Sequence, residues 1–195
     1  MPGQRVVVVR HGETEWSAQL RHTGRTDVPL NDSGRAQATR LRDVLAGHAF
    51  ALVLSSPLQR AAETCRLAGF AESAEVADDL REWDYGAYEG LTTAQIRAQR
   101  PEWRLFRDGP PGGESLDELA RRAHRVIDRI RLADGDALLF AHGHVLRVLA
   151  ATWLELPAAA AERFMLDAAA VGVLGYDREW TAMLCWNVSS LDGAL

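Results

Sequence analysis

The run of four valines at residues 6–9 is the feature that most constrains how this chain can fold. Consecutive β-branched residues without polar alternation are typical of a parallel strand that helices cover on both faces. The run ends at Arg10, His11 and Gly12. Ligands of open α/β sheets bind beyond the carboxyl ends of the strands, so a guanidinium and an imidazole stand where chemistry is expected. For this tripeptide alone, an ordinary loop histidine is the alternative interpretation.

Two further apolar runs end in the same way. Residues 52–54 lead into a segment that contains Arg60, and residues 138–141 lead directly to His142. If the three runs are parallel neighbours in one sheet, these side chains meet the arginine and histidine of the first run at one edge. Because a guanidinium is planar, permanently charged and bidentate, two arginines and two histidines around one point favour a dianionic phosphate as the ligand.

Capping residues and apolar spacing predict the covering elements. One helix is expected to begin at an N-cap on Ser56, with Pro57 in its first turn. The other helices are expected over residues 31–47, 92–100, 115–133, 143–156 and 158–161. The further strands are expected over residues 51–55, 76–80 and 137–141, with a closing hairpin of 171–176 and 181–186. We therefore expect an α/β fold in one domain spanning residues 1–195: a three-layer sandwich, with helices on both faces of a mostly parallel central sheet.

Composition excludes several classes of function. The net charge of −5 disfavours nonspecific nucleic-acid binding, and no stretch approaches the apolar length of a membrane helix or a signal peptide, which favours a cytoplasmic protein. All 22 basic residues are arginine, so P-loop lysines and imine-forming lysines are excluded. Cys65 and Cys185 lie in apolar stretches and are expected to be buried, reduced thiols rather than a disulfide or a metal site.

Six motifs in order resemble the histidine phosphatase superfamily, which includes cofactor-dependent phosphoglycerate mutases and small phosphatases. They cover nearly the whole chain and lie at residues 10–14, 23–24, 56–64, 82–86, 112–115 and 142–143. The resemblance implies a phosphoglycerate mutase-like fold and phosphomonoester chemistry without a metal ion or another cofactor. The expected ligand is a small phosphorylated metabolite, not a nucleic acid or a membrane, and a homodimer is possible.

The resemblance also implies roles for particular residues. His11 is expected to attack phosphorus and form a phosphohistidine, while Glu82 protonates the leaving oxygen and later deprotonates water. An acid that starts protonated would favour mildly acidic conditions. The residues expected to bind the phosphate are Arg10, Arg60 and His142 on its equatorial oxygens, Thr23 and Gly24 lining its pocket, and Ser17, Tyr85 and Gly143 as further contacts, with free amides of the helix after His142 aimed at the same spot.

Within the family, the sequence favours a phosphatase over a mutase. The mutases carry a lysine after their tyrosine-glycine motif, whereas residues 90–93 here are Gly-Leu-Thr-Thr. Residues 82–86 resemble a subgroup of broad acid phosphatases and sugar bisphosphatases. Trp83, Tyr85 and Tyr88 are expected to wall the pocket and to stack on a sugar, with residues 109–113 as a mobile lid. A mutase, a phosphoprotein phosphatase and a noncatalytic binding relative remain as alternatives.

Overall fold

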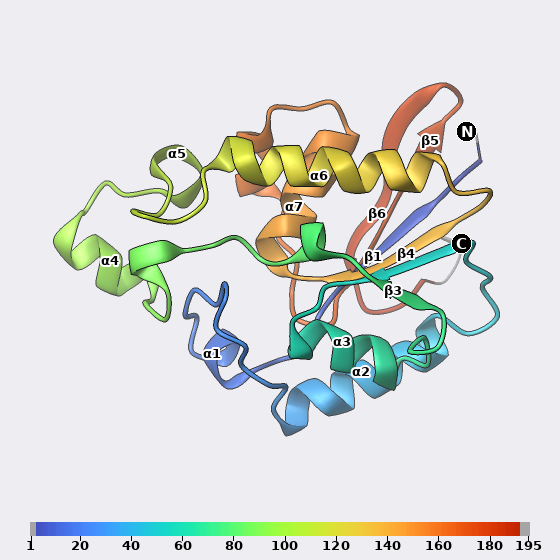
Figure 1. Cartoon of the computed structure of the whole chain (residues 1–195), viewed down its shortest axis with the longest axis horizontal. Coiled ribbons are helices and arrows are strands. Elements are labelled where there is room, and N and C mark those ends of the chain that lie inside the picture. The colour runs from blue at the N-terminus through green and yellow to red at the C-terminus, as the bar shows by residue number, and fades with distance from the viewer. Residues whose placement is uncertain (1–2, 192–195) are drawn as a thin grey trace.

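The computed structural model describes residues 3–191, and its centre is a mixed sheet of six strands within that range (Figure 1). The strand order is β3-β2-β4-β1-β5-β6. The first four strands of this order are parallel, and β5 and β6 add an antiparallel hairpin at one edge. The strands are β1 (Val6–Arg10), β2 (Leu52–Ser55), β3 (Ala74–Val76), β4 (Ala137–Ala141), β5 (Val171–Asp177) and β6 (Trp180–Val188).

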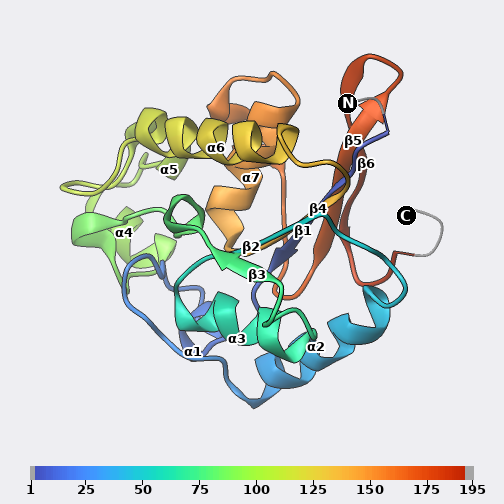
Figure 2. The same cartoon turned by 45° about the vertical axis from the view of Figure 1, so that its right-hand side comes forward.

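Helices cover both faces of this sheet, as the sequence predicts. Figures 1 and 2 show α6 (Leu116–Arg131) and α7 (Gly143–Trp153) on one face, with α2 (Asp32–Val44) and α3 (Gln59–Leu67) on the other. The short elements are α1 (Glu15–Ala18), α4 (Thr93–Gln99), α5 (Leu105–Asp108) and the 3-10 turns η1 (Asp78–Leu80), η2 (Gly86–Tyr88) and η3 (Ala158–Arg163). The α/β sandwich expected from the sequence is confirmed.

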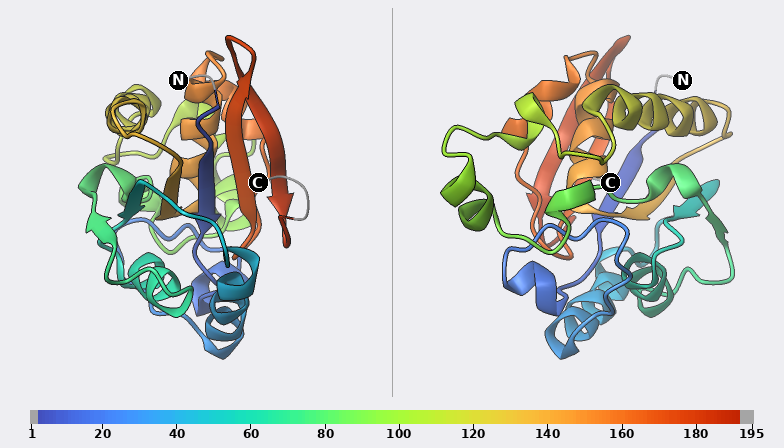
Figure 3. Two further views of the ribbon diagram at one scale, coloured as in Figure 1. Left: turned by 90° about the vertical axis from the view of Figure 1, so that its right-hand side faces the viewer. Right: turned by 60° about the vertical axis from the view of Figure 1, so that its left-hand side comes forward.

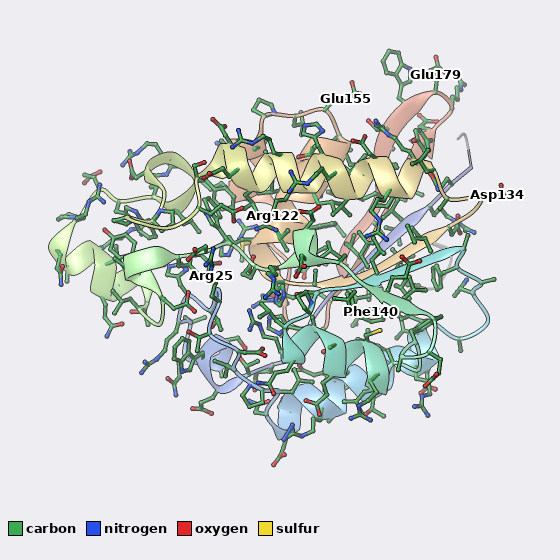
Figure 4. The ribbon with its side chains drawn as sticks, viewed as in Figure 1. Arg25, Arg122, Asp134, Phe140, Glu155 and Glu179 are labelled. Carbon is green, nitrogen blue, oxygen red and sulfur yellow. The ribbon has the colours of Figure 1, made fainter. Side chains whose placement is uncertain are left out.

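The valine run explains the two halves of the core. Successive side chains of a strand point to opposite faces of the sheet. Val6 and Val8 therefore join the cluster under α6 and α7, whereas Val7 and Val9 join the cluster over α2 and α3. Phe140 of β4 belongs to the second cluster, where Figure 4 labels it beside the sheet. Each such fully buried side chain stabilises the fold by roughly 1.5–3 kcal/mol relative to an exposed one.

The parallel register brings the ends of three strands to one edge. Arg10 at the end of β1 is the partner of Ala141 on β4, and Ser55 at the end of β2 is the partner of Phe140. The residues that follow these strands therefore leave the sheet side by side, as the sequence predicts. The antiparallel hairpin of β5 and β6, on the far side of β1, is also confirmed (Figure 3).

A close contact of two glycines holds the loop after β1. A Cβ added to Gly34 in α2 would lie 2.0 Å from the carbonyl oxygen of Glu13, and one added to Gly12 would lie 2.3 Å from that of Gly34. Glycine ordinarily weakens a helix interior by roughly 1 kcal/mol relative to alanine. Here it is the residue that lets α2 approach the backbone next to His11.

Three expectations about local structure are corrected. Helix α3 begins at Gln59, with Leu58 as its N-cap, because the Ser56 hydroxyl instead bonds His142 and the amide of Leu58. The strand expected over residues 76–80 is a short strand that ends at Val76 and is followed by η1. Cys65 is buried, but Cys185 on the edge strand is only partly buried.

No helix of the described residues has both the length and the apolarity that crossing a membrane requires.

Candidate active site

A cavity of about 560 Å³ lies at the edge where β1 and β4 end. This volume is ordinary for a small-molecule site. Seven residues expected from the sequence to act at the site line it, namely Arg10, His11, Ser17, Thr23, Glu82, Tyr85 and Gly143. Gly24, Arg60 and His142 do not line it.

The imidazole of His11 is held in one tautomer. Its Nδ1 lies 2.6 Å from the carbonyl oxygen of Gly12. A carbonyl only accepts hydrogen bonds, so Nδ1 carries the proton and the Nε2 lone pair stays free. Burial, followed by the charges of Arg60 and Arg10, lowers the pKa of His11 well below its ordinary value. The ring is therefore neutral, and its unprotonated nitrogen is available as a nucleophile beside the cavity.

Arg10 provides an unused donor beside His11. Its Nη1 donates to the carbonyl of Leu166 at 2.6 Å, whereas its buried Nε makes no hydrogen bond within residues 3–191. A Cβ at Gly143 would lie 3.4 Å from this Nε, so the glycine lets the guanidinium lie against the start of α7. A buried donor without a partner is costly unless a ligand supplies the acceptor. Arg10 is thus prepared to hold an anion.

Arg60 and His142 lie one layer behind His11. The rings of His11 and His142 are 5.1 Å apart between centroids. The Arg60 Nε donates to His142 Nδ1 at 3.1 Å, which leaves the imidazole proton on Nε2, 2.8 Å from the Ser56 hydroxyl. The remaining Arg60 nitrogens donate to carbonyls in the loop before α2, at residues 23, 24 and 26. The structure therefore brings these side chains together but uses them to organise the loop and the His142 tautomer.

Glu82 occupies the N-terminus of α7. Its carboxylate accepts hydrogen bonds from the backbone amides of Trp83, His144 and Val145 at 2.9–3.0 Å. Two amides of α7 that were expected to face a bound phosphate therefore bind this internal anion instead, which corrects that expectation. The positive end of the helix dipole stabilises the negative charge there.

These contacts decide the charge of Glu82. Burial alone would raise the pKa of this carboxyl, but His144 and His142, together with the backbone donors, hold it well below the ordinary value. Glu82 is 7% exposed and lines the cavity, so its carboxylate borders the same space as His11. Glu82 is therefore ionised rather than protonated, which corrects the idea that the acid starts with its proton.

His144 is a cavity residue to which the sequence reasoning assigned no role. Its Nδ1 lies 2.6 Å from the Tyr85 hydroxyl and 3.8 Å from a Glu82 oxygen. Burial raises the pKa of Tyr85 and lowers that of His144, so the phenol donates to a neutral ring. The sequence signal that could have identified His144 is its position two residues after His142, at the start of the expected helix.

The loop residues expected to line the phosphate pocket have different fates. Thr23 lines the cavity, but its hydroxyl donates to the Arg21 carbonyl. Gly24 is buried behind it, where its carbonyl accepts from Arg60. Ser17 lines the cavity while its hydroxyl closes a capping box with Thr14.

The aromatic wall expected at residues 83–88 is largely wrong. Tyr85 lines the cavity, but Trp83 is fully buried in the core and donates to the Glu114 carbonyl. Tyr88 packs against the same core. Residues 109–113, expected as a lid, do not line the cavity, and Gly113 packs against the backbone of Asp84. The outer walls come from residues 19–22, 92–94 and 165–166 instead.

Histidines around the cavity make the fold sensitive to acid. Burial lowers the pKa of His11, His142 and His144, and lowers that of His22 from 6.5 to about 4. As the pH falls below the unfolded value, the unfolded chain takes up protons that the folded chain excludes. The free energy of unfolding should therefore be at its full value above about pH 7 and decrease as the pH falls from about 6.5 to 4. His22 alone should contribute on the order of 3 kcal/mol to this decrease.

Urea unfolding at several pH values across this window measures the effect. The variant His22→Gln should show a shallower decrease in the free energy of unfolding, because it removes one of the titrating groups. A free energy of unfolding that stays constant from neutral pH down to about pH 4.5 would contradict the burial of neutral histidines.

Comparison with known proteins agrees with this site. The family model described as histidine phosphatase superfamily (branch 1) matches residues 6–189. An acid phosphatase of Mycobacterium tuberculosis is 40% identical over 177 residues, covering 89% of this chain and 87% of that protein. A sedoheptulose 1,7-bisphosphatase of Saccharomyces cerevisiae is 37% identical over 185 residues, covering 78% of this chain and 68% of the yeast protein.

A solved structure extends the match to the whole fold. The product of an open reading frame of Mycobacterium tuberculosis superposes with a TM-score of 0.91 and 36% identity, covering 95% of this chain and 98% of that one. The matched region contains the three parallel strands β1, β2 and β4, whose ends share one edge of the sheet, together with the loop residues around His11. Taken with the neutral histidine and the adjacent arginine at that edge, the match shows that this chain belongs to the histidine phosphatase superfamily and is a phosphatase with the phosphoglycerate mutase-like fold.

Proposed function

We propose that this phosphatase hydrolyses phosphomonoesters of small metabolites, such as sugar phosphates, through a phosphohistidine at His11 and without a metal ion. The observation that carries the proposal is the His11 tautomer. The Gly12 carbonyl holds the proton on Nδ1, which leaves an Nε2 lone pair at a cavity that Arg10 also lines. The unpartnered Nε of Arg10 supplies a donor for a phosphate oxygen.

The reaction would proceed in two displacements. In the first, His11 Nε2 attacks phosphorus, the bond from phosphorus to the ester oxygen breaks, and the leaving oxygen takes a proton from Glu82. In the second, water attacks phosphorus and gives a proton to Glu82, and the bond from phosphorus to nitrogen breaks. The products are the alcohol, inorganic phosphate and the original neutral imidazole.

The proton for the first step would arrive with the substrate. The contacts of Glu82 hold it as a carboxylate. A phosphomonoester has a second pKa of about 6, so below that pH it brings a proton of its own, and a bound phosphate raises the pKa of a nearby carboxyl. Mildly acidic conditions would thus be preferred because of the protonation of the substrate, while the acid-sensitive histidines limit how far the pH can fall.

Arg10 would contact the phosphate directly, with Arg60 and His142 behind it. Arg60 holds His142 with a proton on Nε2, and that proton now faces the Ser56 hydroxyl. A phosphate oxygen near His11 would replace this hydroxyl as the acceptor, since the two rings are only 5.1 Å apart between centroids. Arg10 and His142 would then both donate hydrogen bonds to the equatorial oxygens, and Arg60 would act by holding His142 in the required tautomer.

Hydrolysis is favoured over transfer between hydroxyls. The similar acid phosphatase and bisphosphatase are named for hydrolysis, and this chain has no lysine that could hold a phosphoglycerate as in the mutases. The cavity volume of about 560 Å³ suits a small metabolite rather than a protein surface. Phosphate release and a coupled mutase assay on the same phosphoglycerate distinguish the two reactions.

Trapping the intermediate tests the proposal. The enzyme is mixed with a ³²P-labelled substrate and quenched in alkali, where phosphohistidine survives and phosphate esters of serine do not. We expect the label on the peptide that contains His11. Steady turnover with no label on that peptide, at times when the substrate is saturating, would contradict a covalent intermediate on this residue.

A further inference from the structure

The cavity contains more positive charge than one phosphate requires. Besides Arg10, it is lined by Arg21 and Arg147, whereas Glu82 is the one acidic residue among its described lining residues. The Glu82 carboxylate is already bonded to three backbone amides. This excess of arginine, in a chain whose net charge is −5, makes the outer cavity electrostatically suited to a second anion.

Arg147 is the better placed of the two outer arginines. It projects from α7, and its Nε and Nη2 donate to the carbonyls of Ala161 and Glu162 at 3.0 and 2.9 Å. Its guanidinium lies 5.1 Å from the centre of the Phe106 ring. These contacts fix the plane of the group and leave Nη1 as the nitrogen with no hydrogen bond among residues 3–191. A fixed guanidinium with an open end is a preorganised anion binder.

No carboxylate forms a salt bridge with this side chain within the described part of the chain. The charge pairs within 4.0 Å do not include Arg147, and the carboxylate of its neighbour Glu162 pairs with Arg104. Arg147 is partly buried, and burial lowers its pKa by more than the more distant charges of Glu82 and Glu162 raise it. Burying a cation that has no salt-bridge partner lowers the stability of the fold because the charge loses hydration, and a ligand anion would compensate that loss.

We propose that Arg147 binds a second anionic group of the substrate, so that the enzyme favours phosphomonoesters that carry a further phosphate or carboxylate. The inference rests on the proposed function, because it assumes that the reacting phosphate lies at His11 while the second anion binds Arg147 on α7. Arg21 is the less suitable binder. It is exposed, lies 6.0 Å from the Trp16 ring and reaches the Gly90 carbonyl only at 3.5 Å.

Matched substrate pairs test this proposal. The first pair is 3-phosphoglycerate and glycerol 3-phosphate, which differ by a carboxylate, and the second is fructose 1,6-bisphosphate and fructose 6-phosphate, which differ by a phosphate. We expect Arg147→Met to lower the kcat/KM ratio within at least one pair by roughly 10- to 100-fold, mainly through KM, since one charge-assisted hydrogen bond is lost. The pair that responds identifies whether the second group is a carboxylate or a phosphate.

Three further variants give the controls. Arg121→Met removes the same charge from the exposed face of α6 and should leave both ratios unchanged. Arg147→Lys restores a positive charge and should recover part of the preference, which a purely structural role of the bonds to Ala161 and Glu162 would not explain. If Arg21→Met abolishes the preference and Arg147→Met does not, the assignment to Arg147 is wrong.

Failure of this inference is distinguishable from failure of the proposed function. Turnover of all four substrates with a label on His11, but with no preference within either pair, would overturn the second-anion site alone. Equal losses for both members of each pair in Arg147→Met would also overturn it. Absence of phosphate release from every substrate would instead contradict the proposed function.

Discussion

Replacing His11 by alanine is expected to lower kcat/KM for phosphate release by at least about 10⁴-fold, the scale seen when a covalent nucleophile is removed. The reason is geometric. The loop after β1 presents the neutral imidazole of His11 to the cavity, with its proton directed to the Gly12 carbonyl and its lone pair directed away from it. The His142 ring cannot replace it, because both of its nitrogens are bonded, to Arg60 and to Ser56.

The control for this experiment is another histidine of the chain. His124 lies exposed on α6, outside the cavity, so His124→Ala should keep full activity. Thermal unfolding of His11→Ala establishes that the variant is folded, and binding of inorganic phosphate should persist through Arg10. A variant that is folded, binds phosphate and retains more than about a tenth of the activity would show that another group attacks phosphorus.

Replacing Glu82 by glutamine is expected to have the second largest effect, and the size should depend on the leaving group. Alkyl phosphates such as glycerol 3-phosphate need a proton on the departing oxygen, so kcat should fall by about 10²- to 10⁴-fold. A p-nitrophenolate leaves without that help, so the loss with p-nitrophenyl phosphate should be about 10-fold or less. This difference is the signature of a proton donor.

A structural role for Glu82 predicts a different pattern. The two carboxylate oxygens of Glu82 accept hydrogen bonds from three backbone amides, whereas glutamine has only one carbonyl oxygen that can accept them. The start of α7 would therefore lose part of its stabilisation. That loss would lower activity equally for both leaving groups. Glu118→Gln, at an exposed position on α6, is the matched control and should leave both rates unchanged. Equal losses with the two substrates would remove Glu82 from the role of acid.

The elements that the sequence predicted well are those set by local or periodic signals. The valine run of residues 6–9 has no polar face, so it had to lie between two layers of helices, and both core clusters use it. The capping boxes at Thr92 and Ser115 start helices where they were expected. The convergence of the strand ends followed from the parallel connection alone, because all parallel strands deliver their carboxyl ends to one edge.

Other features depended on contacts between segments that are distant in the sequence. Ser56 resembles an N-cap, yet its hydroxyl bonds His142, 86 residues away. Trp83 is flanked by charged residues and resembles an exposed pocket wall, yet the core closes around it. Local pattern measures what a residue prefers by itself, and it does not reveal which distant group competes for the same donor or the same space.

By itself, the sequence determined the sheet, its two covering layers and the edge at which His11 stands, because periodicity and strand direction act through neighbouring residues. The tertiary structure alone decided the protonation states. The Gly12 carbonyl selects the His11 tautomer, the start of α7 keeps Glu82 ionised, and Arg147 donates to backbone carbonyls rather than to a carboxylate of residues 3–191. Charge and proton position depend on burial and on the nearest donors and acceptors, and those are set only when the chain has packed.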